Sequence, residues 1–230
     1  MQTIGVLGGL GPETTATFYL DLVRRATRER RPRVCIWSLP LDVRKESEYI
    51  AQGAHRRYYQ RLLAHGATAL EQAGSSCLVI PCNTVHEFHP ALSRITRVPI
   101  VNLIDVVVRA VLQRKWHRVL LLATSRTIHT QLYQRALVPH GVDVQIPCVK
   151  EQRALDRLIQ GLLGDRRDPE HQAFLRSLVL QAGTEHIVLG CTDLQLLFPI
   201  ADEVIDSMSV LAEHTASICL RNSVTPRKER

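Results

Sequence analysis

Short runs of apolar residues alternate with longer amphipathic stretches along the chain. The apolar runs are continuous, as expected for strands of a parallel sheet that is buried on both faces, and the stretches between them carry apolar residues at helical spacing. The predicted strands are 3–8, 33–39, 77–81, 98–103, 119–123, 142–147, 186–190 and 203–205. The predicted helices are 12–26, 58–73, 105–113, 124–137, 150–163, 169–181 and 208–220, with a polar, substrate-facing loop at 40–53.

Two segments of the chain repeat the same pattern. Residues 72–84 align with residues 181–193 without a gap, at a constant offset of 109, so that Cys82 falls on Cys191. Each copy has a helix end, a glycine, an apolar strand, and a cysteine followed by amide or hydroxyl residues. Because the other strands match at a similar offset, the pattern indicates a duplication of strand–helix units.

The duplication predicts an α/β fold with two pseudo-symmetric domains. Each domain is expected to be a four-stranded parallel sheet flanked by helices, with right-handed crossovers and an active site in the cleft between the domains. The predicted division gives an N-terminal domain of residues 1–103 that residues 207–230 complete, and a second domain of residues 104–206.

Four residues mark the carboxyl ends of predicted strands: Gly8, Cys82, Thr124 and Cys191. In open α/β sheets, ligands bind beyond these ends. If the two halves face each other around a pseudo-twofold axis, Cys82 and Cys191 lie on opposite sides of one cleft. The turn at Gly8, which contains two more glycines, does not have the spacing of a dinucleotide-binding fingerprint. It is either an anion site or a tight turn.

Two opposed thiols suit inversion of a stereocentre. Cys82 and Cys191 are expected to precede helix N-termini, which lower a thiol pKa from about 8.5 toward neutrality. One thiolate then removes a proton from one face of a carbon, and the opposite thiol delivers a proton to the other face. The carbanion needs hydrogen-bond donors near the substrate carboxylate, and Asn83, Thr84 and Thr192 supply amide and hydroxyl groups. The common alternative role of such residues is N-capping.

Two further residues near the cysteines have open roles. His86 lies one helical turn after Cys82, where it either tunes the thiolate, contacts substrate or is a structural histidine. Asp193 either sets the proton balance beside Cys191 or caps a helix. Cys82, His86 and Cys191 also form a conceivable zinc set, but no zinc-binding spacing is present, and we expect no metal.

Composition limits the other classes of function. The chain has 230 residues and a net charge of +7, and its six cysteines are scattered, as in a reduced cytoplasmic protein. No apolar run is long enough for a membrane span, and the N-terminus lacks the pattern of a signal peptide. Arginines cluster within residues 24–33 without interleaved aromatic residues, so we expect no nucleic-acid partner. A positive field favours anionic substrates.

The motifs resemble those of the aspartate/glutamate racemase family. The resemblance rests on residues 8–12, 81–86 and 190–193 and extends over nearly the whole chain. It implies cofactor-independent racemisation by two cysteines, commonly in a dimer. The catalytic cysteines of the family fall on Cys82 and Cys191, and its amide and hydroxyl contacts fall on Asn83, Thr84 and Thr192.

The resemblance also implies contacts to the substrate side chain. Gln52 looks like the loop glutamine that touches substrate in relatives, and Arg44 lies where aspartate-specific members place an arginine. Leu10 and Thr124 complete the predicted substrate-binding set. Three features depart from the pattern: Leu10 stands where methionine is frequent, Asp193 stands where glutamate is usual, and residues 161–164 lack an expected lysine.

Together these observations predict a cytoplasmic, homodimeric amino-acid racemase without pyridoxal phosphate or any other cofactor. Its expected substrate is aspartate, glutamate or a broader set of amino acids, and no membrane partner is expected. The alternatives are an isomerase or decarboxylase that acts on another small carboxylic acid, and an amino-acid-binding protein that has lost catalysis on the same scaffold.

Overall fold

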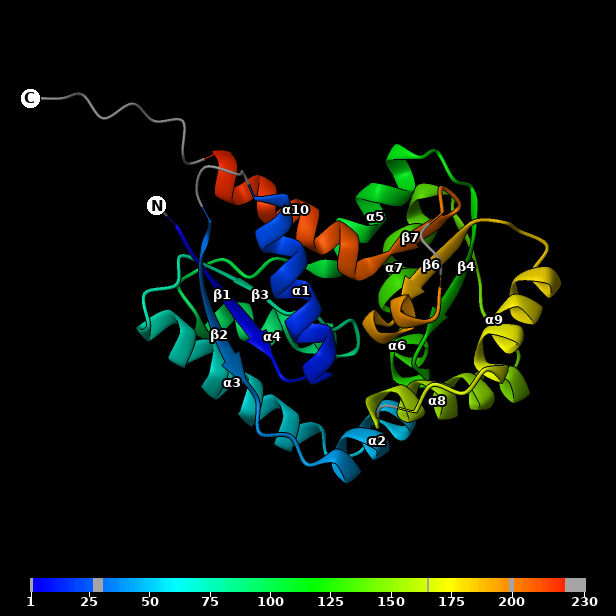
Figure 1. Ribbon diagram of the computed structural model, residues 1–230, viewed down its shortest axis with the longest axis horizontal. Helices are drawn as coiled ribbons and strands as arrows, with labels where there is room; N and C mark the ends of the chain where they lie inside the picture. Colours follow the sequence, from blue (N-terminus) through cyan, green and yellow to red (C-terminus); the bar gives the residue numbers. More distant parts are fainter. Residues whose placement is uncertain (1, 27–30, 165, 199–200, 222–230) are drawn as a thin grey trace, which may run out of the picture.

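The computed structural model describes residues 2–26, 31–164, 166–198 and 201–221, and it contains two parallel sheets with helices around them (Figure 1). The first sheet has the order β2-β1-β3, and the second has the order β5-β4-β6-β7. All pairings within them are parallel, which confirms the predicted α/β class. The strands are β1 Thr3–Gly8, β2 Arg33–Ser38, β3 Cys77–Val79, β4 Arg118–Ala123, β5 Asp143–Gln145, β6 Ile187–Gly190 and β7 Val204–Asp206.

The first sheet is smaller than predicted. Residues 98–103 were expected to form its fourth strand, but they contribute only an isolated bridge between Leu78 and Ile100. The Leu78 N–H donates to the Pro99 carbonyl at 2.9 Å, and the Val101 N–H donates to the Leu78 carbonyl at 2.8 Å. Pro99 has no N–H for a longer ladder, and a helix begins at Leu103.

Helices cover both sheets and connect their strands. The α-helices are α1 Pro12–Arg25, α2 Val43–Gln52, α3 Arg56–Gln72, α4 His89–Ile95, α5 Leu103–Gln113, α6 Ser125–His129, α7 Leu132–Leu137, α8 Val149–Leu163, α9 Glu170–Gln181 and α10 Ser207–Arg221. Short 3₁₀ helices are η1 Thr84–Phe88, η2 Val138–His140 and η3 Thr192–Leu196. None of the helices in the described part of the chain combines the length and the apolar character that a membrane span requires.

Two local predictions were wrong. The expected loop at 40–53 contains α2, whose N-cap Asp42 accepts a hydrogen bond from the Lys45 N–H at 3.0 Å and whose C-cap Gly53 is left-handed, with φ of 72°. Both capping signals are present in the sequence. The expected single helix at 124–137 is interrupted at Gln131, whose φ of 56° separates α6 from α7.

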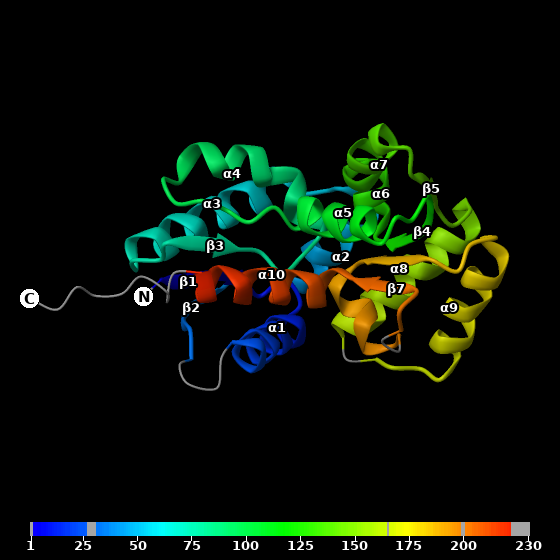
Figure 2. The same ribbon diagram turned by 90° about the horizontal axis from the view of Figure 1, so that it is seen from above.

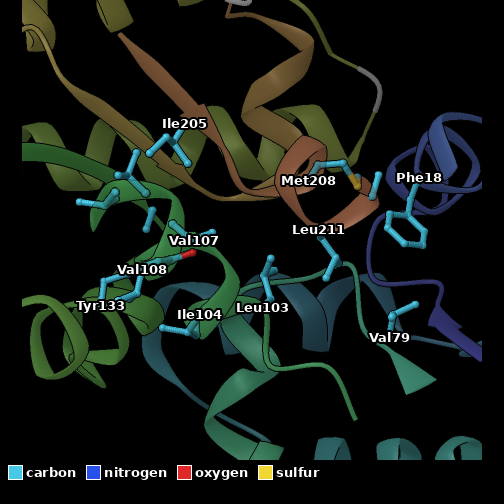
Figure 3. Close-up of a cluster of buried hydrophobic side chains, with 14 of the residues drawn as sticks. Phe18, Val79, Leu103, Ile104, Val107, Val108, Tyr133, Ile205, Met208 and Leu211 are labelled. Carbon is cyan, nitrogen blue, oxygen red and sulfur yellow. The ribbon is translucent and has the colours of Figure 1, made fainter. Parts of the chain in front are cut away.

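One apolar cluster joins the two halves. It contains Val79 of the first sheet and Ile205 of the second, with Val107 of α5 and Leu211 of α10 between them (Figure 3). Helix α10 packs against α1 on one side and α5 on the other (Figures 1 and 2). The two sheets therefore share a core that fixes the position of one relative to the other. The chain passes between the sheets near the beginnings of α5 and α10, while the domain division at 103/104 and 206/207 stays a prediction.

The shared core gives a stability prediction. Leu211 is fully buried in it, whereas Leu180 on α9 is 85% exposed. We expect Leu211→Ala to lower the free energy of unfolding by about 2–5 kcal/mol, because it removes buried methyl groups and leaves a cavity. The control Leu180→Ala should change that free energy by less than about 0.5 kcal/mol. Urea unfolding measures both, and equal effects of the two substitutions would contradict this account of the core.

Candidate active site

A single pocket contains both repeated cysteines. It lies at the carboxyl ends of strands from the two sheets, as predicted, and its free volume is about 20 Å³, close to the space of one water molecule. Helix α2 and helix α8 form its other walls and lie side by side in both views (Figures 1 and 2). Of the residues predicted from the sequence, the pocket is lined by Leu10, Cys82, Asn83, Thr84, Thr124, Cys191 and Thr192.

Two predicted substrate residues, Arg44 and Gln52, lie outside this pocket. The Arg44 side chain is 89% exposed and its Nε lies 3.3 Å from Glu48 Oε1. Gln52 is exposed and lines a separate surface hollow beside Arg126. The reason is that residues 43–52 form a helix rather than a loop, and a helix presents only one face to the pocket.

Sequence reasoning missed several pocket residues. Helix α2 turns Glu46, Tyr49 and Ile50 toward the pocket, and these occupy successive turns of one face. The remaining walls include Tyr59 of α3 and, from α8, Ile159 and Leu163. The spacing of Glu46, Tyr49 and Ile50 at i, i+3 and i+4 is the available sequence signal, once the segment is recognised as a helix.

Each cysteine follows a strand and precedes a 3₁₀ helix. The backbone N–H groups of Thr84 and Val85 in η1 point toward the Cys82 thiol and favour its thiolate. The thiol of Cys191 lies 3.7 Å from the Asp193 carboxylate. A 3₁₀ helix of one turn brings a few N–H groups to each sulfur, but it lacks the long aligned dipole of an α-helix.

The predicted lowering of the thiol pKa values was wrong for this state of the protein. Burial raises the pKa of Cys82 to about 12 and places the pKa of Cys191 well above its ordinary value. The nearby carboxylate of Asp193 raises both pKa values further, and Glu46 adds to the effect on Cys82. Desolvation and negative neighbours therefore outweigh the N–H groups and favour the protonated form of both thiols.

Asp193 is held tightly beneath Cys191. Its carboxylate is buried and accepts a hydrogen bond from the Thr14 hydroxyl of α1. Burial raises the pKa of Asp193 above its ordinary value. Gly11, with φ of 87°, passes so close that an added Cβ would lie 2.9 Å from the Asp193 carboxylate. Since the Gly9 N–H also donates to the Thr15 hydroxyl at 3.0 Å, the glycine turn matches the tight-turn interpretation.

Polar side chains beside Cys82 connect the two halves across the pocket. The Asn83 amide donates to the Ser207 hydroxyl at 2.9 Å and accepts a hydrogen bond from Tyr133. The Thr84 and Thr124 hydroxyls lie 3.0 Å apart. Neither Asn83 nor Thr84 caps a helix through its side chain, so the N-capping alternative was wrong for this pair. Thr124 caps α6 and accepts a hydrogen bond from the Thr127 N–H at 3.2 Å.

His86 is a structural residue. Its Nε2 accepts the Leu103 N–H at 3.0 Å, so its Nδ1 carries the proton and donates to the Cys82 carbonyl at 2.7 Å. Burial lowers the pKa of His86 to about 4, which keeps the ring neutral. Both nitrogens are therefore occupied, and no group of three potential metal ligands occurs within the part of the chain that the structure describes.

A buried ion pair positions α2 over the pocket. Arg126 of α6 donates to both carboxylate oxygens of Glu87, at 2.8 and 2.6 Å. Tyr49 of α2 and Arg56 of α3 donate to the same carboxylate. Burial alone would raise the pKa of Glu87, but these hydrogen bonds hold the pKa below its ordinary value. Glu87 therefore links elements from both halves around the rim of the site.

Known proteins share this fold and its sequence pattern. RacX of Bacillus subtilis, a broad-specificity amino-acid racemase, is 26% identical over 229 residues, which covers 94% of this chain and 98% of that protein. Glutamate racemase of Pseudomonas aeruginosa is 27% identical over 186 residues, covering 74% of this chain and 68% of that protein. A crystal structure of an aspartate racemase homologue from Pyrococcus horikoshii matches with a TM-score of 0.73 and 26% identity, over 94% of this chain and 100% of that one.

The family model described as Asp/Glu/Hydantoin racemase matches residues 7–215. This match spans most of the chain, including both cysteine motifs and the strands that precede them. The protein is therefore a member of the Asp/Glu/Hydantoin racemase family.

Proposed function

We propose that this protein is a cofactor-independent amino-acid racemase in which Cys82 and Cys191 exchange protons with the α-carbon of the substrate. The observation that carries the proposal is the presence of both thiols in one pocket, each at the carboxyl end of a strand from a different sheet. Membership of the racemase family supports the same reaction.

The reaction needs one thiolate and one thiol. The thiolate takes the α-proton and becomes a thiol, and the electron pair of the broken C–H bond spreads into the α-carboxylate. The opposite thiol then gives its proton to the other face of the carbon and becomes the thiolate. The reverse reaction uses the same pair in opposite roles. After one turnover the thiolate is on the opposite cysteine, so a proton must pass from the first thiol to the second before the same enantiomer can react again.

Several groups can support the charge that develops on the substrate carboxylate. The hydroxyls of Thr84 and Thr192 line the pocket beside the two cysteines, and the N–H groups of η1 point toward Cys82. Because these groups are buried and held in place, they need little reorganisation when charge develops. The substrate ammonium group also lowers the local negative potential and favours formation of the first thiolate.

The retained pair favours racemisation over the alternatives. A decarboxylase on this scaffold would need one proton-transfer cysteine, and a binding protein would need neither, whereas both thiols line the pocket here. The prediction of an acidic substrate relied on Arg44, which lies outside the pocket. We therefore propose the amino-acid racemase reaction without restricting it to aspartate and glutamate.

The cysteine pair gives the first functional prediction. Cys82→Ser and Cys191→Ser should each lower racemisation by about 10²- to 10⁴-fold, because each face of the carbon requires its own acid or base. Each variant is expected to retain some α-proton exchange from one enantiomer in deuterated water. Cys148→Ser is the matched control, since Cys148 is exposed and outside the pocket. Chiral chromatography with mass detection measures both quantities, and near-normal racemisation by either pocket variant would disprove the mechanism.

The pH dependence follows from the raised thiol pKa values. At neutral pH the free enzyme holds both thiols protonated, and each increase in pH raises the fraction that carries one thiolate. We expect kcat/KM to rise by up to about tenfold per pH unit between about pH 6.5 and 8.5, below the pKa of the thiol that deprotonates first. A flat or falling profile in this window would mean that a thiolate already exists near neutrality.

Independence from metal is testable by chelation. Within the described residues no set of three potential ligands surrounds the cysteines, so activity should survive exhaustive dialysis against a chelator. Alkylation of thiols in the Cys148→Ser protein should inactivate it, and bound substrate should slow the inactivation. Loss of activity on chelation that zinc restores would instead support a metal site.

A further inference from the structure

The pocket carries two carboxylates and, within the described chain, no lysine, arginine or histidine lines it. Asp193 is engaged by the Thr14 hydroxyl and the Cys191 thiol. Glu46 differs, because its side chain makes no hydrogen bond or ion pair with any other described residue although it is only 8% exposed. The carboxylate oxygens of Glu46 are not among the fully buried atoms that lack a partner, so they keep contact with solvent and are free to meet a ligand in the pocket.

The position of Glu46 is fixed by its helix. It lies one turn before Tyr49, whose hydroxyl donates a hydrogen bond to Glu87. The neighbouring Ser47 carbonyl accepts a hydrogen bond from Gln160 of α8 at 3.2 Å, which ties α2 to α8. Burial raises the pKa of Glu46 to about 7, and the charge of Asp193 contributes. At neutral pH this carboxylate is poised between its two protonation states, and a bound cation would hold it ionised.

A second buried group points to a ligand at the same place. The Tyr59 hydroxyl lines the pocket, is 1% exposed as a residue, and has no hydrogen-bond partner among the described residues. Burial raises the pKa of Tyr59, and the charges of Glu46 and Cys82 raise it further. Glu46 and Tyr59 thus offer an acceptor pair on the Cys82 side of the pocket.

Basic residues on the neighbouring elements are committed elsewhere. Arg126 and Arg56 are bound to Glu87, and the Lys45 ammonium lies 4.5 Å from the centre of the Tyr58 ring. Arg167, which lines an adjoining hollow with Asp193, is paired with Glu13. Any amino acid brings its α-carboxylate to a pocket that already holds two carboxylates, and an acidic side chain would add a fourth, while no described basic residue lines the pocket to compensate. Like charges buried together disfavour each other by several kcal/mol.

We propose that Glu46 determines substrate specificity by receiving the side-chain cation of a basic amino acid such as lysine, ornithine or arginine. This inference rests on the proposed racemase function. The substrate ammonium at the α-carbon would pair with Asp193, and the side-chain cation would pair with Glu46 and the Tyr59 hydroxyl. The apolar side chains of Ile50, Ile159 and Leu163 suit the methylene groups between the two ends of such a substrate.

The test compares substrates and variants. The wild-type protein is incubated in deuterated water with L-lysine, L-ornithine, L-arginine, L-norleucine, L-glutamate and L-aspartate, and both α-deuterium uptake and D-product are measured. We expect kcat/KM for the basic amino acids to exceed that for the acidic ones by at least about tenfold. Glu46→Gln should lower kcat/KM for lysine by about ten- to a hundredfold, mainly through KM. Its effect on norleucine, which lacks the cation, should be less than about threefold.

Glu48→Gln is the matched control, because Glu48 lies on the same helix and pairs with Arg44 and His55 at the surface. It should leave the substrate preference unchanged, and thermal unfolding of both variants verifies that they fold. Two results would overturn the inference. The first is a higher kcat/KM for glutamate or aspartate than for the basic amino acids. The second is an equal loss of kcat/KM for lysine and norleucine in Glu46→Gln, which would mean that Glu46 binds the α-ammonium group. If no amino acid exchanges its α-proton, the proposed racemase function fails as well, whereas exchange of neutral or acidic amino acids alone overturns only this inference.

Discussion

The shared apolar core between the two sheets is the constraint on which the site depends. Helices α5 and α10 pack against each other and contribute side chains such as Val107 and Leu211 to a cluster that also contains residues of both sheets (Figure 3). Burial of apolar surface stabilises this arrangement by about 25 cal/mol per Å². Since the core fixes both sheets, it also fixes the strand ends that carry Cys82 and Cys191.

Polar contacts refine what the core positions. Asn83 joins Tyr133 and Ser207, and Thr84 joins Thr124, so hydrogen bonds cross between the halves directly beside the first cysteine. These groups are buried and hydrogen-bonded to one another, which makes the network rigid and costly to break. Around the rim, the Glu87 ion pair restrains α2 in a similar way. The pocket is therefore preorganised on several sides.

Desolvation decides the electrostatics of this pocket. Cys191 is buried, Cys82 is partly buried, and both thiols lie near two carboxylates, so their protonated forms are favoured. The unpartnered Glu46 has the same origin, because α2 carries it into a region without basic side chains. An amino acid that brings positive charge would relieve both effects. The protonation of the thiols and the proposed choice of substrate thus follow from one burial pattern.

The sequence by itself determined the alternation of seven strands with helices, the repeated motif, and the correspondence of Cys82 with Cys191, because these depend on local periodicity and on a repeat. It did not determine the role of the segment at 40–53, whose polar residues suggested a loop until the capping of α2 was seen. The resemblance to aspartate-specific relatives implies a substrate contact for Arg44, but the face of α2 that meets the pocket carries Glu46 instead. Only the tertiary structure decided which face of α2 meets the pocket and how far burial shifts the thiol pKa values, because both result from packing between segments distant in sequence.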